Sequence, residues 1–376
     1  MKMERQVTKA CLVGIITIFL AGCSGSGAEA PGGAVTGGAA STGGTTATSS
    51  SGKTATSTGG TTATSSSGKT AASSGGTTAT STGGKTATST GGTTATSTGG
   101  TATSSGGTTA TSTGGGTGTS KVTVLLAGSD VNANGPLQTT VEDLSFSGGG
   151  HILVRPTNIT KEPNTKHPVA IWGPGGGTPP RDYLQLLTRM ASQGFVIVGI
   201  RESSGGSELM TAAIDWLEDQ NENSSSPMYN RLILNRVGVF GHSMGGLSSE
   251  ATVRADRRVT TALLDNSGDF GHAALVDVRV PVGIIYGENG QEKPNAEGDY
   301  NNPGNKGPCW LGMMSGGGHG SGPWDGAGAN VAWMRWHIGG DNSRKDAFLG
   351  NGGDYNNRGV WKTQFKNWDG WKNWNE

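Results

Sequence analysis

The sequence predicts an α/β fold with a mainly parallel central sheet and helices on both faces, over residues 121–376. Two observations predict it. Short β-branched runs are bounded by glycine, proline or polar clusters, and apolar stripes at helical spacing lie between these runs. Near-continuous apolar runs are typical of strands buried on both faces of a parallel sheet. Strands that alternate with helices favour parallel packing, with ligands bound at the carboxyl ends of the strands.

The expected elements follow one another in a regular order. Strands are expected over residues 168–172, 195–200, 237–240, 261–264, 280–286 and 310–314. Helices are expected around residues 183–190, 210–217, 247–254 and 331–334.

Charge and cysteine content limit the classes of function. The formal net charge is zero, so we expect neither nucleic acid nor an anionic membrane surface as a partner. Of the three cysteines only Cys309 follows residue 120, which excludes a disulfide within that part. A chain of roughly 250 residues can build a stable core without one. We expect a monomer without metal or cofactor.

Residues 1–23 are typical of an export signal. Basic residues precede an apolar run over 10–21 that is too short to span a membrane. The run ends in Leu-Ala-Gly-Cys23, which resembles the lipobox of bacterial lipoproteins. We therefore expect export and a lipid on Cys23 that anchors the protein in the outer or the cytoplasmic membrane, with Ser24 favouring the outer one. The alternatives are an ordinary signal peptide and a short membrane anchor.

Residues 24–120 are rich in glycine, serine and threonine and contain repeats of sixteen residues over 45–92. Alanine is the only apolar residue in each unit, so no unit has an apolar face that could offset the entropy of ordering. We expect a disordered tether rather than a solenoid. Adhesion through the repeats is the competing function.

A glycine-flanked serine directly follows the expected strand 237–240. Gly241, Ser243 and Gly245 form the Gly-x-Ser-x-Gly pattern, and a helix-compatible stretch comes next. This strand–turn–helix setting predicts that Ser243 is a nucleophile held at the positive end of a helix. The competing interpretation is a tight turn with an incidental serine. His242 should point away from the nucleophile, in a structural or substrate-lining role.

A serine nucleophile needs a base within about 2.6–3.2 Å, and in this kind of fold the histidine comes last along the chain. His319 lies in a glycine-rich loop directly after the expected strand 310–314. We expect it to be the base. His337 falls inside an expected helix and His272 comes too early in the chain.

The developing oxyanion needs two backbone N–H donors. We expect one from Met244, directly after the nucleophile, and one from the glycine loop after strand 168–172. Gly176 is the preferred donor in that loop and Gly177 the alternative. A phosphate-binding loop would need a Lys-Ser/Thr ending, which this segment lacks.

The acid that orients the base should follow strand 280–286. That loop holds two glutamates, of which we prefer Glu292, with Glu288 as the alternative. Either would steady the histidine and stabilise its cation. Asp265, after strand 261–264, is a third candidate.

Five motifs occur together, at residues 168–173, 191–198, 213–217, 241–246 and 318–320. With them the chain resembles secreted α/β-hydrolases of the cutinase and polyester-hydrolase type, which have dienelactone-hydrolase and chlorophyllase relatives. The resemblance implies the α/β-hydrolase fold and ester hydrolysis through an acyl-enzyme. It implies the same roles for Ser243, His319, Met244 and Gly176. Such enzymes usually carry an aspartate at a place that falls here on Gly290 or Gln291.

Three functions remain open at this point. The first is a serine esterase acting on extracellular esters, including polyester or cutin-like ones. The second is a catalytically impaired binding or adhesion protein, suggested by the altered acid loop and by a tryptophan-rich tail over 361–374. The third is a peptidase or other acyl hydrolase with the same triad. The tail tryptophans either stack on polymer surfaces or pack on the domain, whereas Trp172 and Trp310 are expected in the core.

Overall fold

The computed structural model describes residues 122–376 in full and ten short strands between residues 39 and 113. By their internal contacts Met1–Thr119 and Ser120–Glu376 are separate units. The expected export signal with Cys23 lies outside the described residues.

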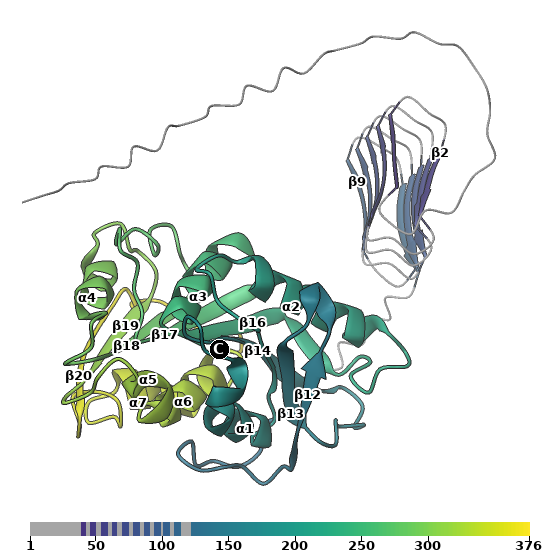
Figure 1. The fold of residues 1–376 in the computed structure, drawn as a ribbon. Coiled ribbons are helices and arrows are strands. Elements are labelled where there is room, and N and C mark those ends of the chain that lie inside the picture. Colours follow the sequence, from purple (N-terminus) through teal and green to yellow (C-terminus); the bar gives the residue numbers. More distant parts are fainter. Residues whose placement is uncertain are drawn as a thin grey trace, which may run out of the picture. The chain divides into compact units, whose positions relative to one another are not determined.

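The second unit is built around one large, mainly parallel sheet (Figure 1). Its strand order is β12-β13-β15-β14-β16-β17-β18-β19-β20. The short strand β11 lies off this path and pairs with the first residues of β14. The six central strands run parallel: β15 (Val196–Gly199), β14 (Thr165–Gly173), β16 (Leu232–His242), β17 (Val259–Asp265), β18 (Val282–Gly287) and β19 (Cys309–Met314).

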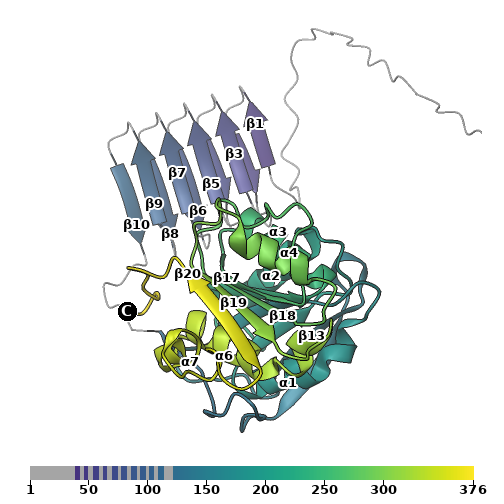
Figure 2. The same ribbon diagram turned by 90° about the vertical axis from the view of Figure 1, so that its left-hand side faces the viewer.

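Antiparallel strands close both edges of this sheet. β12 (Thr139–Leu144) and β13 (His151–Pro156) form one edge, β20 (Trp361–Lys366) forms the other (Figure 2), and β11 is the short pair Thr123–Val124. Sequence analysis did not predict these strands. The outermost strands β12 and β20 are partly exposed, so they lack the apolar runs that mark buried ones. β13 is buried, but its apolar run is only three residues long, over 152–154.

Helices cover both faces of the sheet, as the α/β-hydrolase fold requires. They are α1 (Leu184–Ser192), α2 (Glu208–Glu222), α3 (Met244–Ala255), α4 (Lys293–Asn301), α5 (Ser321–Trp324), α6 (Ala327–His337) and α7 (Lys345–Leu349). Short 3₁₀ turns span Phe146–Gly148, Pro180–Tyr183 and Asn342–Arg344. Side chains of α2 and α4 share one apolar core with the sheet, and those of α1 and α6 share the other. The predicted fold class is confirmed.

The tryptophans mostly serve the core. Trp172 and Trp310 are fully buried, as expected. In the tail, Trp361 is buried, and Trp368 and Trp371 pack against the core of α1 and α6. Trp374 is half-exposed, with the guanidinium of Arg236 3.5 Å from its ring centroid. The tail therefore packs on the domain.

The described strands of the first unit form two parallel sheets of five strands each. Their orders are β1-β3-β5-β7-β9 and β10-β8-β6-β4-β2. The bounds are β1 (Ala39–Thr42), β2 (Thr46–Ser49), β3 (Thr54–Thr58), β4 (Thr62–Ser65), β5 (Thr70–Ser74), β6 (Thr78–Thr82), β7 (Thr86–Thr90), β8 (Thr94–Thr98), β9 (Thr101–Ser105) and β10 (Thr109–Thr113).

The pairing register in these sheets follows the sequence repeat. Thr54 pairs with Thr70, and Thr70 with Thr86, one repeat apart each time. The parallel pairing is made by backbone hydrogen bonds, and threonine favours extended backbone. The residues between and around these strands lie outside the described part of the chain. A tethering role for residues 24–120 stays a prediction.

Candidate active site

Ser243 lies in a tight turn between β16 and α3. Its φ is +53°, a strained conformation for a residue with a side chain, and its N–H donates to the Asp265 carbonyl at 2.9 Å. The turn also packs directly on β14. A Cβ on Gly245 would lie 2.0 Å from the Gly173 carbonyl oxygen, and a Cβ on Gly241 would lie 2.4 Å from the Gly245 backbone. Both glycines are therefore required by the close approach of the backbones.

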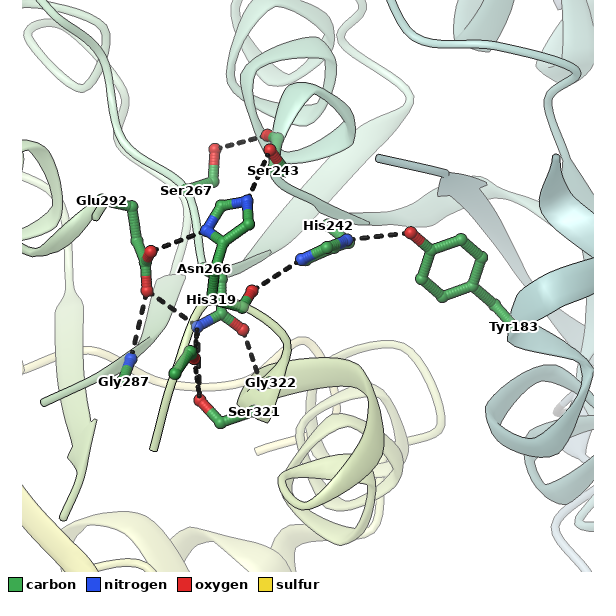
Figure 3. A network of polar contacts seen from close by, with 11 residues as sticks. Tyr183, His242, Ser243, Asn266, Ser267, Gly287, Glu292, His319, Ser321 and Gly322 are labelled. Atoms are coloured by element: carbon green, nitrogen blue, oxygen red, sulfur yellow. Dashed lines mark hydrogen bonds and ion pairs between the residues drawn. The ribbon is translucent and has the colours of Figure 1, made fainter. Parts of the chain in front are cut away.

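Three predicted side chains, from the loops after β16, β18 and β19, meet beyond the carboxyl ends of these strands (Figure 3). The Nε2 atom of His319 lies 3.0 Å from Ser243 Oγ. Its Nδ1 atom lies 2.7 Å from Glu292 Oε2. A carboxylate only accepts hydrogen bonds, so Nδ1 carries the proton of the neutral ring and Nε2 is free to accept one from the serine. The contacts therefore run in series from Glu292 through His319 to Ser243.

Glu292 is buried behind the histidine, with 5% of its surface exposed. Its second oxygen accepts hydrogen bonds from the Asn266 side chain at 2.8 Å and from the Gly287 N–H at 3.2 Å. Burial alone would raise its pKa, but the hydrogen bonds from His319, Asn266 and the backbone outweigh it and hold the pKa below the ordinary value. The carboxylate is thus kept ionised beside the base.

The other two candidate acids lie elsewhere. Glu288 is exposed and accepts a hydrogen bond from the Gly316 N–H at 2.8 Å. Asp265 is fully buried, receives the Asn330 amide at 3.0 Å, and has its pKa raised by burial to about 8. Within residues 122–376 neither carboxyl is hydrogen-bonded to His319.

The absence of a side chain at Gly290 explains how the Glu292 carboxylate fits beside His319. A Cβ at residue 290 would lie only 2.1 Å from Glu292 Oε1 and 2.5 Å from Oε2. The Glu292 carboxylate therefore occupies the space into which a side chain at 290 would project. The usual aspartate and this glutamate would compete for one volume, and the glycine leaves it to the glutamate.

Within residues 122–376, the rings of the remaining histidines form no hydrogen bond with the Ser243 hydroxyl. His242 is buried and bonds through Nδ1 to the Tyr183 hydroxyl and through Nε2 to the His319 carbonyl, both at 2.8 Å. Its side chain thus points away from the serine, into a structural contact. His337 is buried against Trp333, and His272 lies in the loop before α4.

The expected oxyanion donors lie next to each other. Met244 begins α3, where the N–H groups of the first turn have no partner inside the helix. A Cβ on Gly176 would lie 3.1 Å from Met244 Cγ, which places the glycine loop beside the elbow. Within residues 122–376 neither N–H has an acceptor, whereas Gly175 donates to the Tyr183 hydroxyl. Gly177, the alternative, has a φ of +71° and faces open space.

The family model described as PETase, PET hydrolase-like, matches residues 127–364. The chain belongs to this family. Membership implies an ester hydrolase. No curated protein sequence matches the chain. Over the described residues, no helix combines the length and apolar character needed to cross a bilayer.

In this PET hydrolase-like chain a cleft of about 310 Å³ opens beside the serine. Apolar side chains of Met244, Leu247 and Phe270 line it together with Ser243 and His319. Phe270 is 79% exposed, which is unusual for a large apolar side chain. The volume lies at the small end of the range for small-molecule sites, about 300–1,000 Å³.

Sequence analysis missed two residues of this site. Asn266 holds the acid, and Phe270 stands at the edge of the cleft. Both follow the carboxyl end of β17, which is where ligand-binding residues of a parallel sheet gather. A lone phenylalanine in a polar, glycine-containing loop was the available signal.

Proposed function

We propose that the protein is a serine carboxylic-ester hydrolase that works through an acyl-enzyme on Ser243, with polyester or cutin-like esters in its substrate class. The observation that carries this proposal is the unbroken series of contacts from Glu292 through His319 to Ser243. Membership of the PET hydrolase-like family supports the same chemistry.

The reaction begins when Ser243 Oγ attacks the ester carbonyl and His319 Nε2 takes the hydroxyl proton. The N–H groups of Met244 and Gly176 receive the oxyanion of the tetrahedral intermediate. When this intermediate collapses, the imidazolium gives its proton to the departing alkoxide, and the acyl group stays on Oγ.

Deacylation repeats these steps with water. His319 takes a proton from the attacking water and returns it to Ser243 Oγ, which releases the carboxylic acid. The Glu292 carboxylate keeps Nδ1 protonated throughout and stabilises the positive charge on the ring. No cofactor takes part in this scheme.

The shape of the cleft supports an apolar acyl or alcohol portion. Leu247 and Met244 offer apolar surface next to the nucleophile, and Phe270 extends that surface outward. A long ester chain can place one unit in the small cleft and lie against Phe270 with the next. This arrangement suits extended apolar esters better than charged ones.

The binding-protein alternative loses its main support. It rested on the absence of an aspartate from the acid loop, and Glu292 lies at hydrogen-bonding distance from the base. A peptidase would use the same three groups, so peptide substrates belong in the test.

The test compares the full chain with Ser243→Ala and with a matched control, Ser224→Ala, which alters an exposed serine in the loop after α2. Substrates are p-nitrophenyl esters of increasing acyl length, a peptide p-nitroanilide and an amorphous polyester film. We expect Ser243→Ala to lower kcat/KM by about 10³–10⁶-fold on esters and the control to match the parent. Equal rates for the parent and Ser243→Ala would overturn the proposal. If the parent cleaved the peptide p-nitroanilide faster than the esters, the protein would be a peptidase rather than an esterase.

We also propose export with a lipid on Cys23, which the sequence alone supports. The mature chain should start at Cys23, carry an acyl mass on it and fractionate with membranes. Cys23→Ala should abolish the acyl mass. An unprocessed N-terminus in the parent chain would contradict this.

A further inference from the structure

A line of hydrogen bonds joins the two loops that flank the nucleophile. The Gly175 N–H donates to the Tyr183 hydroxyl oxygen at 3.0 Å. That oxygen lies 2.8 Å from His242 Nδ1, and His242 Nε2 lies 2.8 Å from the His319 carbonyl oxygen. Figure 3 shows Tyr183, His242 and His319 lined up in this way.

The chemistry of the groups fixes the direction of every bond. The His319 carbonyl only accepts, so His242 Nε2 must carry a proton. Burial lowers the pKa of His242, which keeps the ring neutral and leaves Nδ1 as an acceptor. Tyr183 must therefore donate its proton to Nδ1, and burial raises the pKa of this phenol. Its oxygen is then free to accept from Gly175.

The line is shielded from water and closely fitted. Tyr183 is 2% exposed and His242 is 8% exposed. The ring of Trp324 stacks on Tyr183 with a centroid distance of 5.3 Å. A Cβ on Gly175 would lie 2.9 Å from His242 Nδ1 and 3.0 Å from the Tyr183 oxygen, so only glycine leaves room for both. Bonds in such a setting are costly to leave unpaired.

The two ends of the line belong to different parts of the proposed machinery. Gly175 directly precedes Gly176, the expected oxyanion donor. The His319 carbonyl belongs to the residue that carries the base. His242, beside the nucleophile, lies between them.

We propose that Tyr183 and His242 are positioning residues that hold the oxyanion loop and the base loop in one fixed arrangement around Ser243. The inference rests on the proposed esterase function of that site. Neither side chain is hydrogen-bonded to Ser243 Oγ or to the ring nitrogens of His319 within residues 122–376. The His242 ring does lie beside the His319 ring, with centroids 5.0 Å apart, and the hydrogen bonds of the line reach the site through the backbone of Gly175 and His319.

The first experiment is Tyr183→Phe in the full chain, which removes one hydroxyl and keeps the ring. The matched control is Tyr286→Phe, which removes another buried hydroxyl, one that donates to Glu297 at 2.8 Å. Since displacements of about 1 Å cost about 10²-fold in rate, we expect Tyr183→Phe to lower kcat by about 10–100-fold with KM within about threefold. The control should keep the parent kcat. Thermal unfolding of both variants shows whether they are folded at the assay temperature.

The second experiment uses rescue at His242. Glutamine can donate to the His319 carbonyl and accept from Tyr183, whereas leucine can do neither. We expect His242→Gln to keep most of the kcat that His242→Leu loses, when both are assayed well below their unfolding temperatures. Equal losses in the two variants would contradict a positioning role through hydrogen bonds.

A third measurement does not depend on activity. In the ¹⁵N-histidine-labelled chain, His242 should show the Nε2-protonated neutral tautomer, and Tyr183→Phe should shift its Nδ1 resonance. If the parent lacks Ser243-dependent hydrolysis, the proposed function fails while this tautomer test still decides the geometry. If the parent is active and Tyr183→Phe keeps its kcat, only the positioning inference is overturned.

Discussion

At the scale of single residues, the acid of the candidate triad is the most informative. Glu292 contacts the base, although the resemblance to polyester hydrolases places the acid nearer residue 290. A glutamate side chain is one methylene longer, and the missing side chain of Gly290 leaves its carboxylate the necessary space. Sequence analysis preferred Glu292 to Glu288 only for its deeper place in the loop, because the folded loop decides which carboxylate reaches His319.

Replacing Glu292 by glutamine should lower kcat by about 10³–10⁴-fold, because the amide cannot hold the tautomer or stabilise the imidazolium. The matched change Glu288→Gln should leave kcat near that of the parent, since this exposed side chain accepts from the Gly316 N–H and, within residues 122–376, is not hydrogen-bonded to His319. Steady-state hydrolysis of p-nitrophenyl acetate measures both. A large loss in Glu288→Gln with none in Glu292→Gln would reverse the assignment.

The volume shared by residues 290 and 292 suggests a rescue. Glu292→Ala should be nearly inactive. Adding Gly290→Asp to it should raise kcat at least about tenfold above that of Glu292→Ala alone, because the new carboxylate would project into the vacated space. The same Gly290→Asp change in the parent should lower activity, since its side chain collides with Glu292. Steady-state kinetics of the three variants test this expectation. If the double variant Glu292→Ala with Gly290→Asp were no faster than Glu292→Ala, a carboxylate at residue 290 could not replace the one at residue 292.

At the scale of elements, the site depends on where parallel strands end. Ser243 follows β16, Glu292 follows β18 and His319 follows β19. The sequence predicted these strands because buried parallel strands are apolar throughout, and the glycine pattern marked the turn after β16. It could not predict Asn266 or the line through Tyr183 and His242, because those contacts join loops that are far apart in the chain.

The contact of β14 with the elbow makes Gly245 sensitive to any side chain. Gly245→Ala would put a Cβ 2.0 Å from the Gly173 carbonyl and should destabilise the fold by more than about 2 kcal/mol. Gly318→Ala is the matched control, because a Cβ there meets nothing within 4 Å. Urea unfolding of both variants measures the difference, and similar midpoints would contradict the close packing described for the elbow.

At the scale of the whole molecule, several buried carboxyls link stability to pH. Burial raises the pKa of Asp265 to about 8 and that of Asp299 to about 6. The pKa of Glu250 is raised well above its ordinary value by burial and by the neighbouring Asp299. The folded chain thus keeps protons that the unfolded chain releases. The stability from these groups is complete below about pH 4 and declines as the pH rises through their folded pKa values.

Asp265 allows a direct test of this linkage. The contribution of the protonated Asp265 to the free energy of unfolding should be lost between about pH 4 and pH 8, so the unfolding temperature of the parent should fall across that window. The asparagine of Asp265→Asn cannot ionise. The unfolding temperature of this variant should therefore fall less between pH 5 and pH 8 than that of the parent, by on the order of 5 °C. Calorimetry at several pH values measures this, and parallel curves for parent and variant would show that Asp265 is not protonated in the folded chain.

The central claim is that Ser243 is a nucleophile activated by His319. A fluorophosphonate probe followed by peptide mass mapping tests it most directly, because the probe forms a bond only with an activated serine. We predict one adduct in the full chain, on Ser243, no labelling of Ser243→Ala, and labelling slowed at least a hundredfold in His319→Ala. An unlabelled Ser243 in the folded parent chain, or equal labelling without His319, would contradict the account.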